Sequence, residues 1–436
     1  MRYRSQRLIG REREISRLAV ALEAAARGHS RRVLLSGVGG IGTSRLVDDA
    51  KQRVGRLSHP FRVIDCQAVP GQAAVPYAPI VAGLRPFLAS LDDAELGRVV
   101  GSAIEPLGHL MPELVGRLGP PTSRRLTIAP DRRTAWLNEA IRGLLERAGE
   151  HAPVMLVMQD IHHADGGTRE LTTFLARVAR PARLCLIITF GSDALTRGHP
   201  VLTDLATMAQ SSDPPDRLEL EPLARSELVQ LITEIEGERP TAAAVLLVAD
   251  RSGGNPLFAE EILAARRELS SVSLGASLQE LVSARLARRS PECRRLLRLL
   301  APAGQPLSEG EITAAVEVFE RLAVTLPPRS SSLPRRANGG LEPDLQAGLY
   351  EAHEHGFVIP RLDGRLELRH ELIAGAIEAD LLPHQRRRHH EAIAEALADR
   401  PAEALPHWRA ANRPEAALDA AIAAATLADE LDSPAD

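Results

Sequence analysis

Residues 37–44 read Gly-Val-Gly-Gly-Ile-Gly-Thr-Ser, and they match the phosphate-binding loop pattern G-x-x-x-x-G-K-[ST] at every fixed position except the lysine. Thr43 stands at the lysine position. The apolar run Val33–Leu35 precedes the loop and a helical pattern from Ser44 to Asp49 follows it, which is the strand–loop–helix order that the motif requires. Backbone N–H groups of such a loop hold phosphate, and the helix N-terminus adds partial positive charge. The loop therefore predicts a nucleotide-binding fold, whereas the missing lysine predicts impaired catalysis.

Other cations do not obviously replace the lysine. Lys51 is the only lysine in the chain, and it lies seven residues beyond Ser44. That is about 10 Å along a helix, which is too far from the phosphates. Arg45 is nearer, but it lies one helix position after Ser44, so we expect its side chain to point away from the phosphates. A plain strand-to-helix turn is the alternative interpretation of the glycines.

Composition bounds the class of protein. The 436 residues suffice for about three domains of roughly 150 residues. A hydrophobic content of 44% and a charged content of 25% are typical of globular proteins. The net charge of −4 gives no global attraction to nucleic acid or to an anionic membrane. No signal-peptide core and no apolar run of about 18 residues is present, so we expect a cytoplasmic protein without membrane association.

The three cysteines are far apart in the sequence and lack the spacing of a metal site. Cys66, Cys185 and Cys293 are therefore predicted to be reduced core residues.

Short apolar runs alternate with helical patterns in the first half of the chain. Beyond residues 33–36, the predicted strands are residues 61–66, 153–158, 184–190 and 218–220. Continuous apolar runs fit strands covered on both faces, and alternation with helices implies a parallel sheet.

The second half of the chain becomes helical from about residue 225. Residues 277–301 predict a helix pair, and residues 326–340 predict an exposed or disordered insert. Residues 358–368 predict a hairpin with an Asp-Gly turn, which together with its flanking helices indicates a winged-helix unit.

The predicted fold is an α/β P-loop NTPase with a parallel sheet, followed by a helical lid, a winged-helix-like α+β domain and an α-helical tail. The expected boundaries are 1–222, 223–275, 276–400 with the insert, and 401–436.

The predicted strand at residues 153–158 ends at Gln159 and Asp160. A nucleotide hydrolase needs an acidic residue at such a strand end to hold Mg²⁺. Gln159 is neutral, so Asp160 is the candidate catalytic residue and, with the hydroxyl of Ser44, the candidate metal ligand. The alternatives are a turn aspartate and a serine that only caps its helix.

Two basic clusters receive less specific interpretations. His162 and His163 lack an evident third ligand in the sequence and are interpreted as surface or crevice histidines. The run Arg386–His390 is interpreted as a solvated helix face, with a phosphate or nucleic-acid contact as the alternative.

Taken together, these features resemble the signal-transduction ATPases with numerous domains (STAND), in particular the ATPase part of large LuxR-type transcriptional regulators. Besides the phosphate loop, the segments that carry the resemblance are Leu8–Glu12, Ala74–Pro79, Gln159–Asp165, Gly254–Phe258, Leu368–Leu372 and His407–Ala411.

The resemblance implies a site for ATP or ADP with Mg²⁺. By this likeness Ile9, Gly10 and Arg11 lie by the adenine, Pro256 lies against the base, and His370 approaches the phosphates. The implied loop contacts are Gly37, Gly39, Gly40, Ile41, Gly42, Thr43, Ser44 and Arg45. The last segment, His407–Ala411, is similar to the start of a helical-repeat region.

Three charged groups of the resembled family are replaced, by Thr43, Gln159 and Gly191. A charge-assisted hydrogen bond contributes about 1.5–3 kcal/mol, so losing the lysine weakens nucleotide binding by roughly 10–150-fold. Hydrolysis depends more strongly on positioned charge.

We therefore expect an adenine-nucleotide-binding regulatory module of the STAND type, part of transcriptional regulation, with weak or absent hydrolysis; any ATPase activity is expected to be slow. The alternative is a nucleotide-free scaffold. A protein partner or self-association is expected. Direct DNA binding by the winged-helix unit is a third hypothesis. The unit has no clear basic recognition helix, so DNA binding by this chain alone is not expected.

Overall fold

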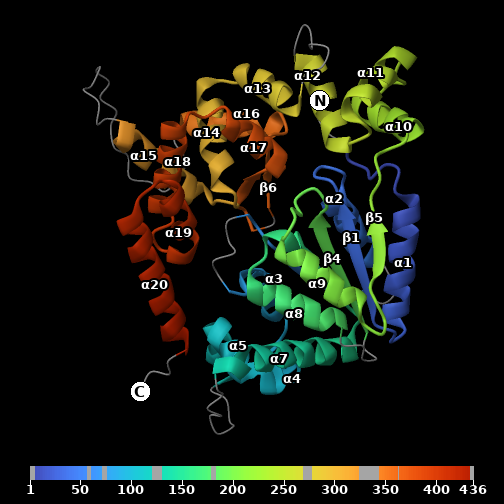
Figure 1. The fold of residues 1–436 in the computed structure, drawn as a ribbon, viewed down its shortest axis with the longest axis vertical. Coiled ribbons are helices and arrows are strands. Elements are labelled where there is room, and N and C mark those ends of the chain that lie inside the picture. The colour runs from blue at the N-terminus through green and yellow to red at the C-terminus, as the bar shows by residue number, and fades with distance from the viewer. Residues whose placement is uncertain are drawn as a thin grey trace. The chain divides into compact units, whose positions relative to one another are not determined.

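The computed structural model describes residues 5–55, 60–70, 76–119, 130–177, 183–268, 277–323, 343–361 and 363–432. The chain divides into two compact units (Figure 1). The α/β unit comprises Gly10–Glu221 and Leu427–Asp436, and the helical unit comprises Met1–Ile9 and Pro222–Thr426. Residues 5–9 therefore associate with the helical unit, where the Ser5 N–H donates to Glu260 Oε1 at 3.1 Å.

A five-stranded parallel sheet organises the α/β unit, in the order β2-β3-β4-β1-β5. The strands are β1 (Arg31–Gly37), β2 (Arg62–Gln67), β3 (Val154–Gln159), β4 (Leu184–Gly191) and β5 (Asp216–Glu219). Every residue of β3 is buried, as its unbroken apolar run predicts for a strand with both faces covered. The predicted α/β P-loop class and parallel sheet are confirmed.

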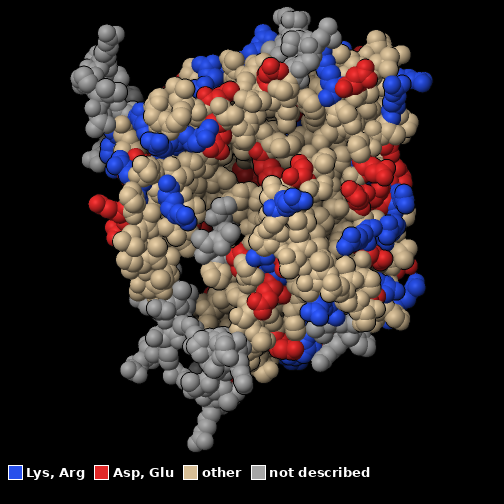
Figure 2. Space-filling view, in the orientation of Figure 1, with Lys and Arg blue, Asp and Glu red and all other residues tan. Residues whose placement is uncertain are grey.

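Helices lie on both faces of this sheet (Figure 1). They are α1 (Glu12–Ala26), α2 (Thr43–Val54), α3 (Ala78–Ala89), α4 (Asp93–Val100), α5 (Ile104–Leu110), α6 (Pro112–Leu118), α7 (Pro130–His151), α8 (Gly166–Arg177) and α9 (Pro200–Ala209). On the face of the unit shown in Figure 2, basic and acidic side chains are interspersed, so the described part of that face has no basic stripe of the kind that nucleic acids need.

The register of β1 and β4 positions the candidate site. The two strands run in parallel and end together, with Gly37 paired to Gly191. Parallel strands bring their carboxyl ends to one edge of a sheet, where ligands of such folds bind. The segments that follow Gly37 and Gly191 therefore start side by side.

The described part of the helical unit has helices throughout and one antiparallel hairpin; that they form a lid and a winged-helix domain stays a prediction. Its helices are α10 (Arg225–Glu236), α11 (Ala242–Ser252), α12 (Pro256–Glu268), α13 (Leu278–Ala287), α14 (Pro291–Leu300), α15 (Glu309–Ala323), α16 (Pro343–Glu354), α17 (Glu371–Ala379), α18 (Pro383–Ala396) and α19 (Pro401–Ala410), and α20 (Pro414–Asp432) ends the described chain. Strands β6 (Val358–Pro360) and β7 (Leu366–Leu368) form the predicted antiparallel hairpin. Gly364, with φ +78°, makes the predicted turn. The predicted insert at 326–340 lies outside the described residues.

One sequence interpretation is wrong in this unit. The run Arg386–His390 is not a solvated face throughout, because His389 is only 4% exposed and its ring stacks on Phe319. His390 Nδ1 lies 3.0 Å from His407 Nδ1. The two histidines of the run therefore belong to the packing between α18 and its neighbours α15 and α19.

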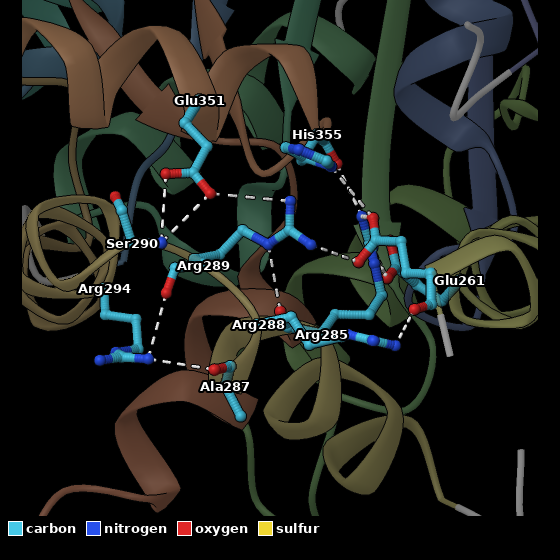
Figure 3. Close-up of polar contacts among 10 residues, drawn as sticks. Glu261, Arg285, Ala287, Arg288, Arg289, Ser290, Arg294, Glu351 and His355 are labelled. Carbon is cyan, nitrogen blue, oxygen red and sulfur yellow. Dashed lines mark hydrogen bonds and ion pairs between the residues drawn. The ribbon is translucent and has the colours of Figure 1, made fainter. Parts of the chain in front are cut away.

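A buried ionic cluster joins α12 to α13, to the segment after α13, to the residue after α16 and to the residue after β7 (Figure 3). In the pairs that α12 makes, the helix contributes the glutamates and the facing elements contribute three arginines and one histidine. The pairs are Glu261–Arg285, Glu261–Arg369, Glu260–Arg369, Glu268–Arg285, Glu268–Arg289 and Glu268–His355. Glu261 is fully buried, and burial opposes its charge; Arg285 and Arg369 outweigh that cost and lower the pKa of the Glu261 carboxyl.

The three cysteines are buried and unpaired, as predicted. Among the helices of the described residues, none combines the length and the apolar character needed to cross a membrane.

Candidate phosphate-binding site

The loop between β1 and α2 adopts a shape that glycine alone makes easy. Gly40 and Gly42 have φ values of +80° and +107°, in the left-handed region. The Ile41 N–H donates to the Val38 carbonyl at 3.1 Å, which closes the turn. Gly42 then caps α2, and its carbonyl accepts the Leu46 N–H at 3.0 Å. Helix α2 therefore starts at Thr43, and its N-terminal N–H groups belong to the loop.

Gly37 is required for a second reason, which is space. A Cβ at this position would lie 2.5 Å from Ile41 Cγ2, closer than side-chain carbons approach. The absent side chain lets the loop fold back over the end of β1.

Arg11 holds the loop in place through hydrogen bonds. Its side chain is buried, and its guanidinium donates to the carbonyls of Ile41 at 3.1 Å and of Glu221 at 2.8 Å. These two bonds join the loop to Glu221, which lies just after β5. Gly10, with φ +66°, precedes it, whereas Ile9 packs in the helical unit's core. The predicted contacts of Ile9, Gly10 and Arg11 with adenine stay a prediction.

Lys51 is engaged elsewhere. Its ammonium lies 2.7 Å from Asp65 Oδ2 and 2.6 Å from Asp48 Oδ1. Burial opposes the charge, but the two carboxylates outweigh it and raise the pKa of Lys51. Lys51 thus does not substitute for the loop lysine, as its distance along α2 indicates.

The same Asp65 explains Gln159. The Gln159 amide donates to Asp65 Oδ1 at 2.7 Å, and its side chain is buried. Because Asp65 on β2 accepts from both Lys51 and Gln159, the neutral glutamine bridges strands β3 and β2. Nothing in the sequence indicates this contact, because it depends on β2 and β3 being neighbours in the sheet.

Asp160 follows Gln159 at the end of β3. Its φ of +54° is left-handed, a conformation that aspartate tolerates better than most residues. Its N–H donates to Thr189 Oγ1 on β4 at 2.9 Å. The strain and the contact hold Asp160 at the edge where the loop lies. Its role as catalytic residue or metal ligand stays a prediction.

Asp165, in the same segment, has a structural role that the sequence did not indicate. Its Oδ1 accepts the N–H groups of Tyr77 at 3.1 Å and of Thr168 at 2.9 Å. It therefore fastens residues 76–79 to the start of α8. His162 makes a similar link between the segment after β3 and the end of β4, because its Nδ1 accepts the Gly191 N–H at 3.2 Å.

A carboxylate that the sequence did not single out lies on the loop. The Gly39 N–H donates to Asp193 Oδ1 at 3.1 Å and to Asp193 Oδ2 at 3.2 Å. Ser192 N–H donates to the Gly37 carbonyl at 2.9 Å, which sets the segment beside the loop.

Ser44 and Asp160 supply the oxygen atoms that Mg²⁺ prefers, and the loop supplies N–H donors for phosphate. Ser44 is exposed on the first turn of α2, and Arg45 beside it is half-buried. The residues present fit a phosphate group, and the departure from the motif is the absent cation at Thr43.

The remaining predicted contacts lie in the helical unit. Gly254 has φ +80°, and a Cβ there would lie 2.6 Å from the Leu223 carbonyl oxygen. The absence of a side chain therefore permits the hydrogen bond from the Leu223 N–H to the Gly254 carbonyl, at 2.8 Å. Helix α12 starts two residues later, at Pro256. His370 caps α17, where its Nδ1 accepts the Leu372 N–H at 3.1 Å. Contacts of Pro256 and His370 with a nucleotide stay predictions.

Comparisons with known proteins find a family model that matches part of the chain. Residues 7–188 match the family model described as an AAA ATPase domain. None of the curated proteins matches the chain.

One solved structure shares the fold, and others are similar to it at lower TM-scores. One is the STAND protein with a tetratricopeptide repeat sensor from Pyrococcus horikoshii, with a TM-score of 0.53 and 14% identity over 95% of this chain. The match covers 49% of that protein, so this chain spans about half its length. Others are a Walker-type ATPase of Pyrococcus abyssi (TM-score 0.41, 14% identity, covering 86% of this chain and 97% of that one) and the Aeropyrum pernix Orc1 protein in complex with DNA (TM-score 0.39, 20% identity, 86% and 93%).

Proposed function

We propose that this chain is a regulatory module of the STAND type that binds ADP or ATP and hydrolyses ATP slowly or not at all. The observation that carries the proposal is the loop of residues 37–44, which keeps its left-handed glycines and its helix N-terminus but has Thr43 in place of lysine. Proteins of the AAA class bind nucleotide with Mg²⁺, and the P. horikoshii STAND protein has this fold.

The physical case separates binding from hydrolysis. Binding draws on several N–H donors and on the partial positive charge of α2, which remain. Hydrolysis needs charge placed on the transferring phosphoryl group, and the three replaced positions remove that charge. A module of this kind senses which nucleotide is present, and a role in transcriptional regulation follows from the resemblance to LuxR-type regulators.

The test is a calorimetric titration of the purified chain with ADP and ATP, each with and without Mg²⁺. We expect saturable binding in the high-micromolar range or weaker, with a rise in melting temperature at saturation. Absence of heat and of a melting shift at millimolar nucleotide would refute the proposal.

A matched pair of variants separates the loop from general stability. Gly42→Ala and Gly28→Ala both force a side chain onto a left-handed backbone, at φ +107° and +92°, with open space around the added carbon. Each should destabilise the fold by about 1 kcal/mol or more. Only Gly42→Ala should lose nucleotide binding, because Gly28 lies in the turn before β1.

A second candidate is a nucleotide-free scaffold that binds a protein partner. It is favoured by the engagement of Lys51 with Asp65, which leaves the loop without a lysine on the described part of α2. An unchanged melting temperature at saturating nucleotide together with stable partner binding would support this candidate.

A further inference from the structure

An internal carboxylate lies where an anionic ligand of the loop would compete with it. Both oxygens of Asp193 lie within hydrogen-bond distance of the Gly39 N–H, at 3.1 Å and 3.2 Å. Gly39 is the third residue of the phosphate loop, and Asp193 is exposed. A carboxylate on a backbone N–H uses the same interaction that the loop offers to phosphate.

The sheet enforces this placement. Gly37 and Gly191 are paired residues at the ends of adjacent strands β1 and β4, and the Ser192 N–H bonds the Gly37 carbonyl at 2.9 Å. Each segment then continues by two residues, to Gly39 and to Asp193. The contact is therefore a consequence of strand register and not of a chance approach between two surface groups.

We propose that Asp193 determines nucleotide specificity at this loop: it acts as an internal anion that disfavours nucleoside triphosphates relative to diphosphates. The inference rests on the proposed function. An incoming phosphate chain meets the negative charge of Asp193 at the loop, and no lysine at position 43 offsets it. A triphosphate is longer and more negative than a diphosphate, so it is repelled more strongly.

The experiment compares the wild-type chain with Asp193→Asn and Asp193→Ala by calorimetric titration with ADP and ATP. Asparagine removes the charge but keeps an oxygen that can accept from Gly39, and alanine removes both. The control is Asp92→Asn, because Asp92 makes the same kind of contact far from the loop, accepting the Glu95 N–H at 2.8 Å. Titrations run with Mg²⁺ and with a chelator.

Both Asp193 variants should bind ATP about tenfold more tightly than the wild type, and ADP by a smaller factor, with the chelator present. Asp92→Asn should bind as the wild type does. A larger gain in alanine than in asparagine would assign part of the effect to displacement of the hydrogen bond, whereas equal gains would assign it to charge. Either pattern supports the inference.

Three results would overturn it. The variants bind both nucleotides as the wild type does; they bind Mg²⁺–ATP more weakly, which would make Asp193 a metal ligand; or ADP and ATP gain equally. Failure of the proposed function gives a different pattern. If the wild type binds neither nucleotide and Asp193→Asn binds ATP, the inference about Asp193 holds and the proposed nucleotide binding by the wild type fails. If no folded variant binds either nucleotide, both fail.

Discussion

Single residues decide what the phosphate loop can hold. The loop keeps the glycines that shape it, and Arg11 anchors it through the Ile41 carbonyl. Thr43 removes a cation, and Asp193 adds an anion at Gly39. We expect both changes to act in the same direction, because each makes the charge at the loop less positive and so less favourable to an anionic ligand.

Restoring the lysine should restore affinity. Thr43→Lys is expected to bind ATP about tenfold or more tightly, since a charge-assisted hydrogen bond contributes about 1.5–3 kcal/mol. The new cation sits at the N-terminus of α2, where it opposes the helix dipole and costs about 0.3–1 kcal/mol of stability. Calorimetry and urea unfolding measure the two effects.

The control is Thr43→Met, which has a long side chain without charge. It should leave the affinity near that of the wild type. Equal affinities for the lysine and methionine variants would show that position 43 does not face the phosphates.

At the scale of elements, α12 is joined by ion pairs to the helices and segments that follow it in the helical unit. Its three glutamates, Glu260, Glu261 and Glu268, face four basic side chains. These are Arg285 of α13, Arg289 after it, His355 after α16, and Arg369. Figure 3 shows Arg285 directed at Glu261, and Arg289 directed at Glu351 as well. A buried ion network is weak support for net stability, but breaking it is costly because the remaining charges stay buried.

Glu261→Gln should therefore destabilise the helical unit by about 3–5 kcal/mol, because Arg285 and Arg369 lose a buried counter-charge. Since the pKa of Glu261 is lowered in the folded chain, its contribution is present at neutral pH and is lost as the pH falls through that pKa. The destabilisation caused by the variant should accordingly shrink in acid. Urea unfolding at pH 7 and at low pH measures it.

Glu23→Gln is the matched control. Glu23 pairs with Arg27 across one turn of α1, and both side chains are mostly exposed, at 62% and 74%. Such pairs contribute about 0–1 kcal/mol. A similar effect for Glu23→Gln and Glu261→Gln would contradict the importance of burial.

At the scale of the whole molecule, stability is expected to depend on histidines far from the candidate site. Burial lowers the pKa of His389 and of His390 to about 4, and that of His407 to about 3. The facing Nδ1 atoms of His390 and His407 are 3.0 Å apart, so two protonated rings would direct N–H donors at each other.

Because these pKa values lie below the unfolded value of about 6.5, the unfolded chain binds more protons between pH 6.5 and 4. The free energy of unfolding should therefore fall as the pH drops below 6.5, by up to about 1.4 kcal/mol per pH unit for each proton taken up. His389→Phe should flatten this slope, whereas His384→Gln, at an exposed position, should not. Urea unfolding between pH 7.5 and pH 4.5 measures the slope of the free energy of unfolding against pH. Equal slopes for both variants would show that the buried histidines do not cause the pH dependence.

The sequence by itself determined the features that depend on neighbouring residues. Glycines at the left-handed positions 40 and 42, the apolar runs of β1, β3 and β4, and the Asp-Gly turn at 364 are local, so they predict the loop, the parallel sheet and the hairpin. Tertiary structure decided the rest, because pairing between distant side chains depends on strand register and packing. It brought Asp193 to Gly39, gave Lys51 and Gln159 a shared partner in Asp65, and buried His389 within a run of charged residues that appears solvated when read alone.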